Sequence, residues 1–461
     1  MSKNTGARLS AVAFLMVGIA IGYIAANGGF NHISVAEADD ATTSKEPSQP
    51  AQIQPAQNAT RATQLTALVD AADDVPEPEL GKHEMPSEWA PWKDPNNPNV
   101  LLLSDDKDKF FLRRDKSKHT PGLTDPQRYV GGSLISGFPT FLGAPMAFTT
   151  EDLKAGEVDL ALVGICIGDQ PVPGANFAAN KMRTLTDWMT FPGGTNNMTG
   201  TDYGKLRLAD YGNVAWNFFA NNQRNVEEVY RVVSEILDAD VVPVGIGGTH
   251  VQTYAFHTAL AKKYGPKTFA TLHIDAHYDT YMYGFGRMVH NGSFLKVAIE
   301  KGLIDGSDLV QVGLRGESPD AASLAWMRKH KLKFHFQTEI QKDGWDAVLK
   351  RVLRELKGKK LHISWDMDGM DPAAAPGVGT QDPDGLTAAQ GLQLVRAVAI
   401  QNEIVAAEFN EYNPLLDDAH TTTGVLMDRL IRSMLAGIQA RRDGITDPLY
   451  YDPERLRHDS E

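Results

Sequence analysis

Cysteine is nearly absent from this 461-residue chain, whose single example is Cys166. One thiol can form neither an intramolecular disulfide nor a zinc site with several thiolates, so we interpret Cys166 as a small, buried apolar side chain. Basic residues are also in deficit, because 45 Lys and Arg stand against 58 Asp and Glu and leave a net charge of −13. Phosphate backbones are bound by basic patches, so this composition argues against a nucleic acid as a partner.

Long uncharged apolar runs are also scarce, and the clearest one is Leu9 to Ala26, with 18 residues. That length is just enough to cross a bilayer as a helix. Lys3 and Arg8 precede the run and acidic residues follow it, so the positive-inside rule places the N-terminus in the cytoplasm. We therefore predict a transmembrane anchor at residues 1–30 and a membrane-anchored catalytic domain on the non-cytoplasmic side, which is the periplasm in a bacterium. A cleaved signal peptide is the alternative.

The composition divides the chain into further segments. Aromatic residues are scarce in residues 31–85, which are rich in Ala, Thr, Gln, Ser, Pro and acids, so we predict a disordered tether there. Trp89 and Trp92 mark renewed order. We predict a loop-rich N-terminal extension at 86–157, a catalytic domain at 158–439 and a C-terminal tail at 440–461.

Within residues 158–439, short apolar runs alternate with stretches of helical spacing. The spacing predicts helices over 226–237 and 348–356, a capping box of Thr387 with Gln390 begins another, and Ser318-Pro319 opens a further one. Strands that alternate with helices form a parallel sheet covered on both faces, so we predict an α/β fold. The strand candidates are Leu160 to Ile165, Val241 to Ile246, Thr268 to Ile274, Leu309 to Leu314, Leu361 to Trp365 and Ile404 to Phe409.

Polar residues follow several of these strand candidates at the point where each apolar run ends. Ligands of parallel sheets bind beyond the carboxyl ends of the strands, so these side chains should meet there. Burying four aspartates together is prohibitive without cations, and the arrangement therefore predicts a divalent metal site. His273 lies inside an apolar run, and we interpret it as a packed core histidine. The four segments are Gly247-Gly248-Thr249-His250, Asp275-Ala276-His277-Tyr278-Asp279, Asp366-Met367-Asp368 and the stretch that leads to Glu411.

These motifs, in this order, resemble the ureohydrolase family, which includes arginase and agmatinase, and they match agmatinase-like members best. The resemblance covers about residues 137–439 and includes segments at 172–176, 311–316 and 411–414. It implies a three-layer α/β/α domain around a parallel sheet, assembled as a homo-oligomeric trimer or hexamer. It also implies a binuclear centre with two Mn²⁺ per subunit, and Ni²⁺ is the alternative metal.

The resemblance further implies roles for individual residues. Asp275 and Asp366 would bridge the two metals, Asp279 would orient the attacking hydroxide, His290 would carry a proton to the leaving amine, and Glu411 would pair with the guanidinium. The metal ligands would be His250, Asp275, Asp279 and Asp366 for one ion, and Asp275, His277, Asp366 and Asp368 for the other.

Three positions depart from the family pattern. Thr249 stands where the family has an acid before the metal-binding histidine, which removes a carboxylate from the surroundings of that ligand. Trp365 replaces a phenylalanine beside Asp366, and Asn291 interrupts the His-Gly pair that follows the proton-carrying histidine. Every implied metal ligand is nevertheless present.

The sequence thus predicts a hydrolase that splits a small guanidino compound into an amine and urea, with agmatine or 4-guanidinobutyrate favoured. The residues between Asp279 and His290 include aromatic side chains and Arg287 in place of the polar clamp of arginases, so we expect arginine to be a poor substrate. Free guanidine is an alternative substrate. A non-catalytic, membrane-tethered binding protein is the alternative from another class.

Overall fold

The computed structural model describes residues 93–94, 97–101, 120–126, 138–168, 173–188, 194–214, 222–281, 289–317 and 319–457. The predicted anchor at 1–30 and tether at 31–85 lie outside these residues, as do the last four residues of the predicted tail. Near the start of the described part, β1 (Lys93–Asp94) and β2 (Asn97–Leu101) form a two-stranded antiparallel pair.

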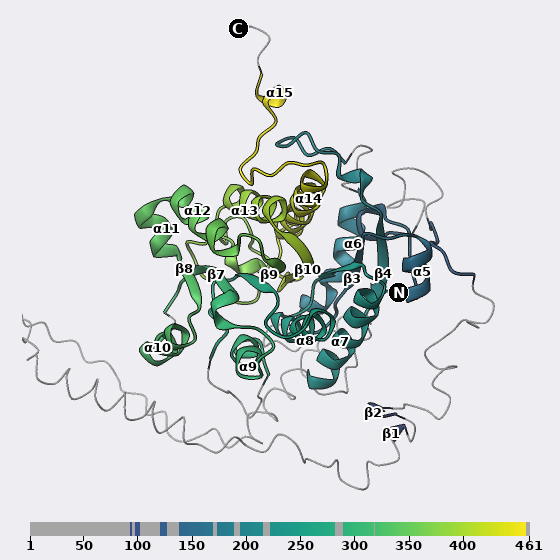
Figure 1. Cartoon of the computed structure of the whole chain (residues 1–461), viewed down its shortest axis with the longest axis horizontal. Helices are drawn as coiled ribbons and strands as arrows, with labels where there is room; N and C mark the ends of the chain where they lie inside the picture. The colour runs from purple at the N-terminus through teal and green to yellow at the C-terminus, as the bar shows by residue number, and fades with distance from the viewer. Residues whose placement is uncertain are drawn as a thin grey trace, which may run out of the picture. The chain divides into compact units, whose positions relative to one another are not determined.

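The centre of the catalytic region is a parallel sheet with eight described strands, in the order β4-β3-β5-β10-β9-β6-β7-β8 (Figure 1). All six predicted strands are present within two residues of their expected limits, which confirms the α/β class. The strands are β3 (Leu160–Gly164), β4 (Leu208–Asn213), β5 (Val242–Ile246), β6 (Ala270–Ile274), β7 (Leu309–Leu314), β8 (Lys333–Phe336), β9 (Lys360–Asp366) and β10 (Glu403–Asn410).

Helices cover both faces of this sheet, which gives the expected three layers. Alternate residues of a strand enter different cores: Leu160 and Leu162 join one apolar cluster, whereas Ala161 and Val163 join the other. The first cluster includes α6 (Ala178–Trp188), α12 (Trp345–Leu356), α13 (Ala388–Gln401) and α14 (Thr422–Arg442), and the second includes α5 (Thr150–Ala155), α7 (Asn222–Asp238), α8 (Thr253–Tyr264) and α9 (Phe294–Glu300).

Two local sequence signals fix helix starts. Thr387 caps α13, and its side chain and that of Gln390 form the predicted reciprocal capping box. The helix expected at Ser318-Pro319 begins slightly later, because Asp320 caps α10 (Ala321–Lys329) by accepting a hydrogen bond from Ser323 N. The remaining described helices are α11 (Gln337–Asp343), α15 (Pro453–Leu456) and the 3₁₀ helices η3 (Phe141–Gly143), η4 (Ala175–Phe177), η5 (Tyr203–Lys205), η6 (His250–Gln252), η7 (Gly306–Asp308) and η8 (Met367–Gly369).

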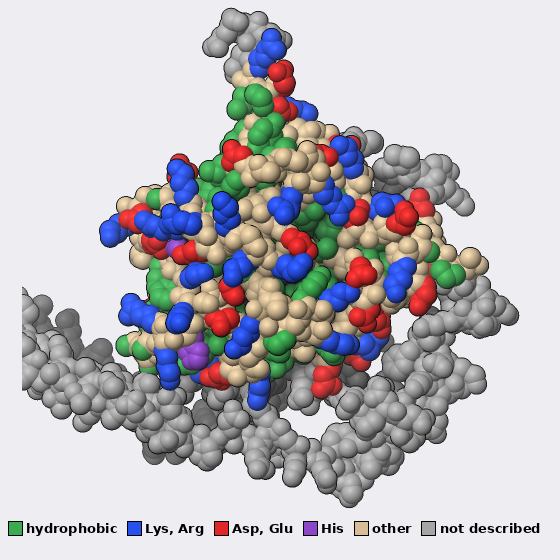
Figure 2. Space-filling model, viewed as in Figure 1, with side chains coloured by type: hydrophobic (Ala, Val, Ile, Leu, Met, Phe, Trp, Pro, Cys, Tyr) green, Lys and Arg blue, Asp and Glu red, His purple; other side chains and the backbone are tan. Residues whose placement is uncertain are grey.

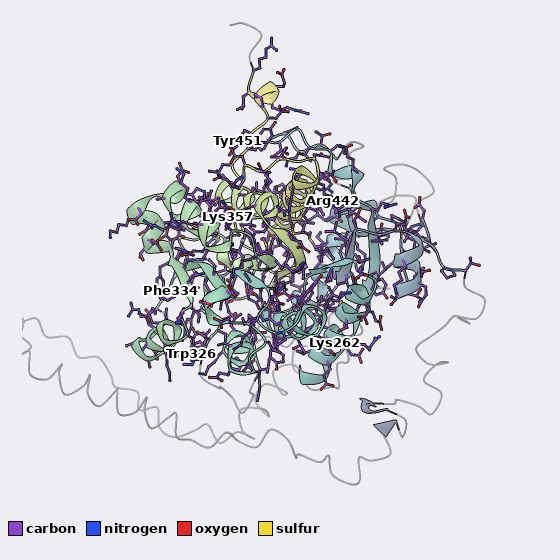
Figure 3. All side chains as sticks on the ribbon, in the orientation of Figure 1. Lys262, Trp326, Phe334, Lys357, Arg442 and Tyr451 are labelled. Atoms are coloured by element: carbon purple, nitrogen blue, oxygen red, sulfur yellow. The ribbon has the colours of Figure 1, made fainter. Side chains whose placement is uncertain are left out.

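The two outermost strands, β4 and β8, were not predicted. Strand β4 reads Leu-Ala-Asp-Tyr-Gly-Asn and β8 reads Lys-Phe-His-Phe, so neither has the continuous apolar run that marks the inner strands. Edge strands pair on one side and remain partly exposed, which explains their mixed composition. Phe334 of β8 and Trp326 of α10 lie on the same side of the molecule, whereas Lys262 of α8 lies apart from them (Figure 3).

Basic and acidic side chains are interspersed over the face of the described residues in Figure 2.

The structure does not support the location that the sequence predicted for the protein. Within the part of the chain that the structure describes, no helix is both long and apolar enough to cross a membrane. The prediction rested on an 18-residue run at the lower limit of spanning length, and that run lies outside the described residues. The predicted membrane-anchored, non-cytoplasmic location is therefore wrong.

Candidate metal centre and active site

The polar segments follow four strands that are neighbours in the sheet: β5, β10, β9 and β6. His250 lies in η6 after β5, Asp275 follows β6, and Asp366 is the last residue of β9. Because these strands are parallel and adjacent, their carboxyl ends bring the side chains to one edge of the sheet. The predicted convergence is therefore present.

One cluster is centred on the imidazole of His250. Its Nδ1 atom lies 2.9 Å from Asp275 Oδ2, 3.0 Å from Asp366 Oδ2 and 3.4 Å from Asp279 Oδ2. All four residues are buried. One ring nitrogen can donate a single hydrogen bond, so it cannot satisfy three carboxylates by itself.

A second cluster is centred on His277. Its Nδ1 atom lies 3.2 Å from Asp275 Oδ1 and 3.1 Å from Asp368 Oδ2, so the two oxygens of Asp275 face different clusters. The side chain of His277 is 27% exposed, whereas those of Asp275 and Asp368 are 1% exposed. The second cluster is therefore the one that opens toward solvent.

The donor set fits divalent cations. Among the described residues, neither His250 Nδ1 nor Asp275 Oδ2 has a hydrogen-bond partner, although both are buried and 2.9 Å apart. Atoms that are close together without hydrogen-bond geometry can instead point at a common ion. Two groups could hold such an ion by distance: His250, His273, Asp275 and Asp279, and Asp275, His277 and Asp368.

The pKa values of the clustered aspartates also favour a bound cation. Burial raises the pKa of Asp279 to about 6, and repulsion from Asp275 adds to the effect. Burial also raises the pKa of Asp366 well above its ordinary value, with repulsion from Asp368 and Asp275. Burial opposes ionisation of Asp275 too, but the neighbouring histidines hold its pKa well below the usual range. A bound cation would compensate these crowded charges.

Backbone geometry fixes the loops that carry these residues. Gly247 and Gly248 have φ values of 85° and 76°, and a Cβ atom on Gly247 would lie 2.8 Å from Ala178 Cβ. Asp279 and Glu411 have φ values of 48° and 66°, in the left-handed region that L-residues rarely adopt. Such strained residues persist where the surrounding structure determines them, often at functional sites.

Glu411 lies beside the first cluster and is 3% exposed. Its Oε1 atom accepts a hydrogen bond of 2.7 Å from His250 N, and its own N–H donates to Gly248 O at 2.8 Å. Burial raises the pKa of Glu411 to about 8, and Asp368 and Asp275 contribute repulsion. The predicted substrate-binding carboxylate is therefore at the site.

His290 belongs to a segment that the side chain of Asn291 connects to the residue after His250. Its Nδ1 atom accepts a hydrogen bond from Gly292 N at 3.1 Å, so the neutral ring carries its proton on Nε2. Asn291 Oδ1 accepts a hydrogen bond of 3.0 Å from Val251 N, next to His250. Asn291, which looked like an imperfection in the motif, therefore connects the two histidine segments.

Sequence reasoning missed a buried polar chain behind His250. Thr253 donates its hydroxyl proton to Glu408, and Ser364 Oγ lies 3.1 Å from Thr253 Oγ1 and 2.8 Å from His250 Nε2. Since the Thr253 proton is used, Ser364 must donate to Thr253 and accept from His250 Nε2. The lone pair of His250 Nδ1 is thus directed at the carboxylates. Burial raises the pKa of Glu408 to about 7.

His273 is a packed core histidine, as interpreted, but its position beside the first cluster was not predicted. It is fully buried as expected, but its Nε2 atom faces Asp275 Oδ2 at 3.2 Å and Asp279 Oδ2 at 3.7 Å. Its position two residues before Asp275 on an extended strand, which places both side chains on one face, was the available signal. Two further fully buried histidines are His257 and His362, where burial lowers the pKa of His257 to about 3 and that of His362 well below its usual value.

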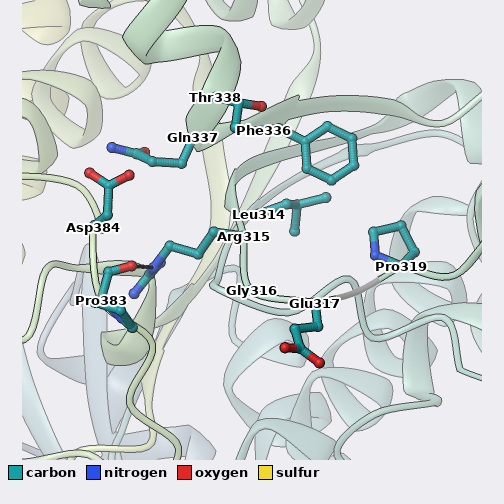
Figure 4. Close-up of a pocket in the computed structure, with 10 residues that line it drawn as sticks. All are labelled: Leu314, Arg315, Gly316, Glu317, Pro319, Phe336, Gln337, Thr338, Pro383 and Asp384. Atoms are coloured by element: carbon teal, nitrogen blue, oxygen red, sulfur yellow. Dashed lines mark hydrogen bonds between the residues drawn. The ribbon is translucent and has the colours of Figure 1, made fainter. Parts of the chain in front are cut away.

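Arg315 braces the loop that carries Asp368. Its guanidinium donates to the carbonyl oxygens of Asp368 at 2.6 Å, Asp382 at 2.7 Å and Pro383 at 3.0 Å. Arg315 also lines a cavity of about 400 Å³ at the carboxyl ends of β7 and β8, together with Phe336 (Figure 4).

The loop between Asp279 and His290, on which the substrate prediction depends, is described only in part. Its residues 282–288, including Arg287, lie outside the described residues.

A sequence model described as the arginase family matches residues 158–437, which is more than half of the chain and includes all the candidate site residues from His250 to Glu411. The chain belongs to the arginase family. A guanidino acid hydrolase of human mitochondria is 31% identical over 61% of this chain and 78% of its own length. A mitochondrial agmatinase of Gallus gallus is 30% identical over 65% of this chain and 85% of its own length.

Solved structures support the same assignment. The proclavaminate amidino hydrolase of Streptomyces clavuligerus has a TM-score of 0.59 and 26% identity, and the match covers 67% of this chain and 99% of that one. The arginase-family chain described here is an agmatinase-like ureohydrolase that acts on a guanidino compound, as the motifs predicted. The alternative of a non-catalytic, membrane-tethered binding protein finds no support.

Proposed function

We propose that this ureohydrolase is a binuclear-metal amidinohydrolase that splits agmatine or 4-guanidinobutyrate into an amine and urea. The convergence of three carboxylate oxygens on His250 Nδ1, with Asp275 facing a second cluster as well, carries the proposal. The carboxylates suit Mn²⁺, and the imidazoles also suit Ni²⁺, which is the alternative metal. The proposed ligands are His250, Asp275, Asp279 and Asp366 for one ion, and Asp275, His277, Asp366 and Asp368 for the other.

A bound pair of divalent cations would supply a nucleophile near neutral pH by lowering the pKa of a shared water. The protein would provide the orientation. Asp279, fixed in its left-handed conformation, would accept a hydrogen bond from the attacking oxygen. Glu411 has Oε1 fixed by His250 N, which leaves Oε2 to accept from the planar guanidinium.

His290 would handle the proton that the leaving amine needs. The hydrogen bond from Gly292 N to Nδ1 directs the proton of the neutral ring to Nε2, where the ring can hydrogen-bond the leaving nitrogen, and the protonated ring would deliver its proton from the same atom. The proton that the attacking water loses on adding to the guanidinium carbon would replace the one that His290 donates, so the amine would leave protonated and His290 would return to its starting state.

The choice of substrates is supported by the chemistry of the site and by the names of the relatives. The human relative is named for guanidino acids, a class that contains 4-guanidinobutyrate, and the Gallus gallus relative is named for agmatine. Free guanidine is the second candidate, because Thr249 and Asn291 alter the surroundings of the two histidine segments relative to the family pattern. A homo-oligomer, a trimer or hexamer, is part of the same proposal.

The experiment is a urea-release assay of the full chain, loaded with Mn²⁺ or Ni²⁺, on agmatine, 4-guanidinobutyrate, guanidine and arginine. We expect one of the first three to have the highest kcat/KM and arginine to be a poor substrate. Glu411→Gln should keep its metal but lose at least about 100-fold in kcat/KM, because a neutral amide cannot form the charged pair. Arginine in first place would refute the substrate proposal, and no urea from any guanidine would refute the reaction.

A further inference from the structure

The cavity at the carboxyl ends of β7 and β8 is distinct from the proposed active site. Its volume of about 400 Å³ lies within the range of about 300 to 1,000 Å³ that small-molecule sites have. The described residues that line it include no proposed metal ligand and neither His290 nor Glu411 (Figure 4). A ligand in this cavity would therefore be bound by other residues than those proposed for catalysis.

Arg315 lines the cavity but has no hydrogen-bond donor left for an anion. Its guanidinium donates to seven carbonyl contacts, which involve Nε, Nη1 and Nη2. The shortest is 2.6 Å, from Nη2 to Asp368 O. A guanidinium has five N–H groups, so these contacts use all of them. Arg315 is also 9% exposed and is therefore a part of the wall rather than a binding group.

Two carboxylates in the cavity wall have no cation beside them. Within the described part of the chain, neither Glu317 nor Asp384 forms an ion pair, and Asp384 accepts one hydrogen bond from Gln341 Nε2. Asp384 has a φ of 66°, in the left-handed region that non-glycine residues rarely adopt. Such strain often marks functional positions. Two carboxylates beside one saturated guanidinium favour a cationic ligand.

Gln337 gives an independent indication of a ligand with N–H donors. This cavity residue is 6% exposed, and its Nε2 donates to Gly385 O at 3.3 Å. Its Oε1 has no hydrogen-bond partner among the residues that the structure describes. A buried acceptor without a partner is costly, and an N–H donor bound in the cavity would satisfy it. Leu314 and Phe336 add carbon surface to the wall, which suits a methylene chain.

The geometry points to a second, non-catalytic binding site in this cavity for an aliphatic diamine. One ammonium group would bind at Glu317, and the other would bind between Asp384 and Gln337. The methylene chain would lie against Leu314 and Phe336. Gln337 is bonded to Gly385, the residue after Asp384, whereas Glu317 is drawn apart from both in Figure 4. A ligand with one charge at each end therefore fits these walls better than a ligand with a single charge.

The site would let a product of the reaction bind outside the active site. Hydrolysis of agmatine releases 1,4-diaminobutane, which is an aliphatic diamine, and this link rests on the proposed function. Arg315 connects the two places, because its guanidinium donates both to Pro383 O in the cavity wall and to Asp368 O beside a proposed metal site.

The test is a calorimetric titration of the Mn²⁺-loaded full chain with 1,4-diaminobutane. Because this amine could also enter the proposed active site, the titration is carried out in the Glu411→Gln variant as well as in wild type. In Glu411→Gln we expect one diamine per subunit, with a Kd at least about tenfold weaker for 1-aminobutane, which has one ammonium group. Butanoate, an anion of similar length, should not bind.

Charge-removing variants in the Glu411→Gln background locate the site. Glu317→Gln and Asp384→Asn keep the shape of the side chains, and asparagine tolerates the left-handed conformation of residue 384. We expect each to weaken diamine binding about tenfold. Asp320→Asn is the matched control, because it removes a nearby exposed charge but keeps a side chain that caps α10, and its Kd should stay within about twofold. In the wild-type background, both cavity variants should keep kcat/KM within about twofold.

Several results would overturn the inference. They are no diamine binding to Glu411→Gln, an unchanged Kd in both cavity variants, butanoate binding as tightly as the diamine, or a crystal structure in which a neighbouring subunit fills the cavity. Urea release by wild type reports separately on the proposed function. If wild type releases urea but the diamine does not bind to Glu411→Gln, the function stands and the diamine site is wrong. If the diamine binds as expected but no guanidino compound yields urea, the site stands and the proposed function is wrong.

Discussion

At the scale of single residues, Asp275 and Asp366 are predicted to contribute to both ions, and Asp368 to one. Each oxygen of Asp275 faces a different histidine, and Asp366 Oδ2 lies 3.0 Å from His250 Nδ1 while its Oδ1 accepts from Asp368 N. Bridging carboxylates hold two cations at a short separation, so their loss should have the larger effect.

Asp366→Ala should therefore retain almost no Mn²⁺, whereas Asp368→Ala should retain about one ion per subunit, as expected for a ligand to a single site. Elemental analysis after dialysis measures both, with circular dichroism to show that the variants are folded. Equal metal retention in the two variants would contradict the bridging role of Asp366.

Asn291 should position His290 without affecting metal binding. Its side chain makes the hydrogen bond to Val251 N, which lies next to His250. Asn291→Ala removes that bond, and we expect kcat/KM to fall about tenfold, the equivalent of ~1.4 kcal/mol, with two Mn²⁺ retained. Asn180→Ala on α6, whose amide oxygen binds Asn213, is the control and should keep full activity. Loss of metal from Asn291→Ala would show that the residue acts on the metal site itself.

At the scale of helices and strands, the sequence predicted a strand correctly wherever a continuous apolar run indicated that both faces of the strand are buried. Strand β7 occupies the predicted residues because Leu309 to Leu314 are all buried. Edge strands β4 and β8 escaped prediction because most of their residues are at least partly exposed. For the site, strand-end motifs located the proposed ligands, but a hydrogen bond such as that of Gln311 to His273 joins residues 38 apart and has no local signal.

Strand β8 and two helices are connected by a titratable group, His335. Its Nδ1 and Nε2 atoms lie 2.9 Å from Glu339 Oε2 on α11 and 3.0 Å from Glu355 Oε2 on α12. Burial lowers the pKa of His335, but attraction to Glu355 and Glu339 outweighs it and raises the pKa above the ordinary value. Arg351 also pairs with Glu339 and with Asp343.

Because the folded pKa of His335 is raised, its stabilising contribution is complete below the unfolded value of about 6.5 and is lost as the pH rises through the folded pKa. Urea unfolding should therefore show a larger loss of stability in His335→Gln at pH 5.5 than at pH 9. His420→Gln, at an exposed turn, serves as the control. A difference that is independent of pH would mean that His335 contributes only packing.

At the scale of the whole molecule, the proposed site is confined to a limited part of the chain. Its residues run from His250 to Glu411, and the family match runs over residues 158–437. Residues before position 158 nevertheless pack against this part of the chain. Phe141 is fully buried, its N–H donates to Asp210 Oδ2 at 3.1 Å, and the Arg183 guanidinium lies 4.0 Å from the centre of its ring.

Two truncations separate these contributions. A chain that begins at residue 86 keeps Phe141 and the whole proposed site, so it should bind two Mn²⁺ and keep kcat/KM within about twofold of the full chain. A chain that begins at residue 158 loses Phe141 and the buried Leu153, and loss of one large buried side chain alone costs about 3 to 5 kcal/mol. We expect the shorter chain to be unfolded or insoluble, as measured by circular dichroism and calorimetry. A chain from residue 86 that folds, binds two Mn²⁺ and yet releases no urea would show that the first 85 residues contribute to catalysis.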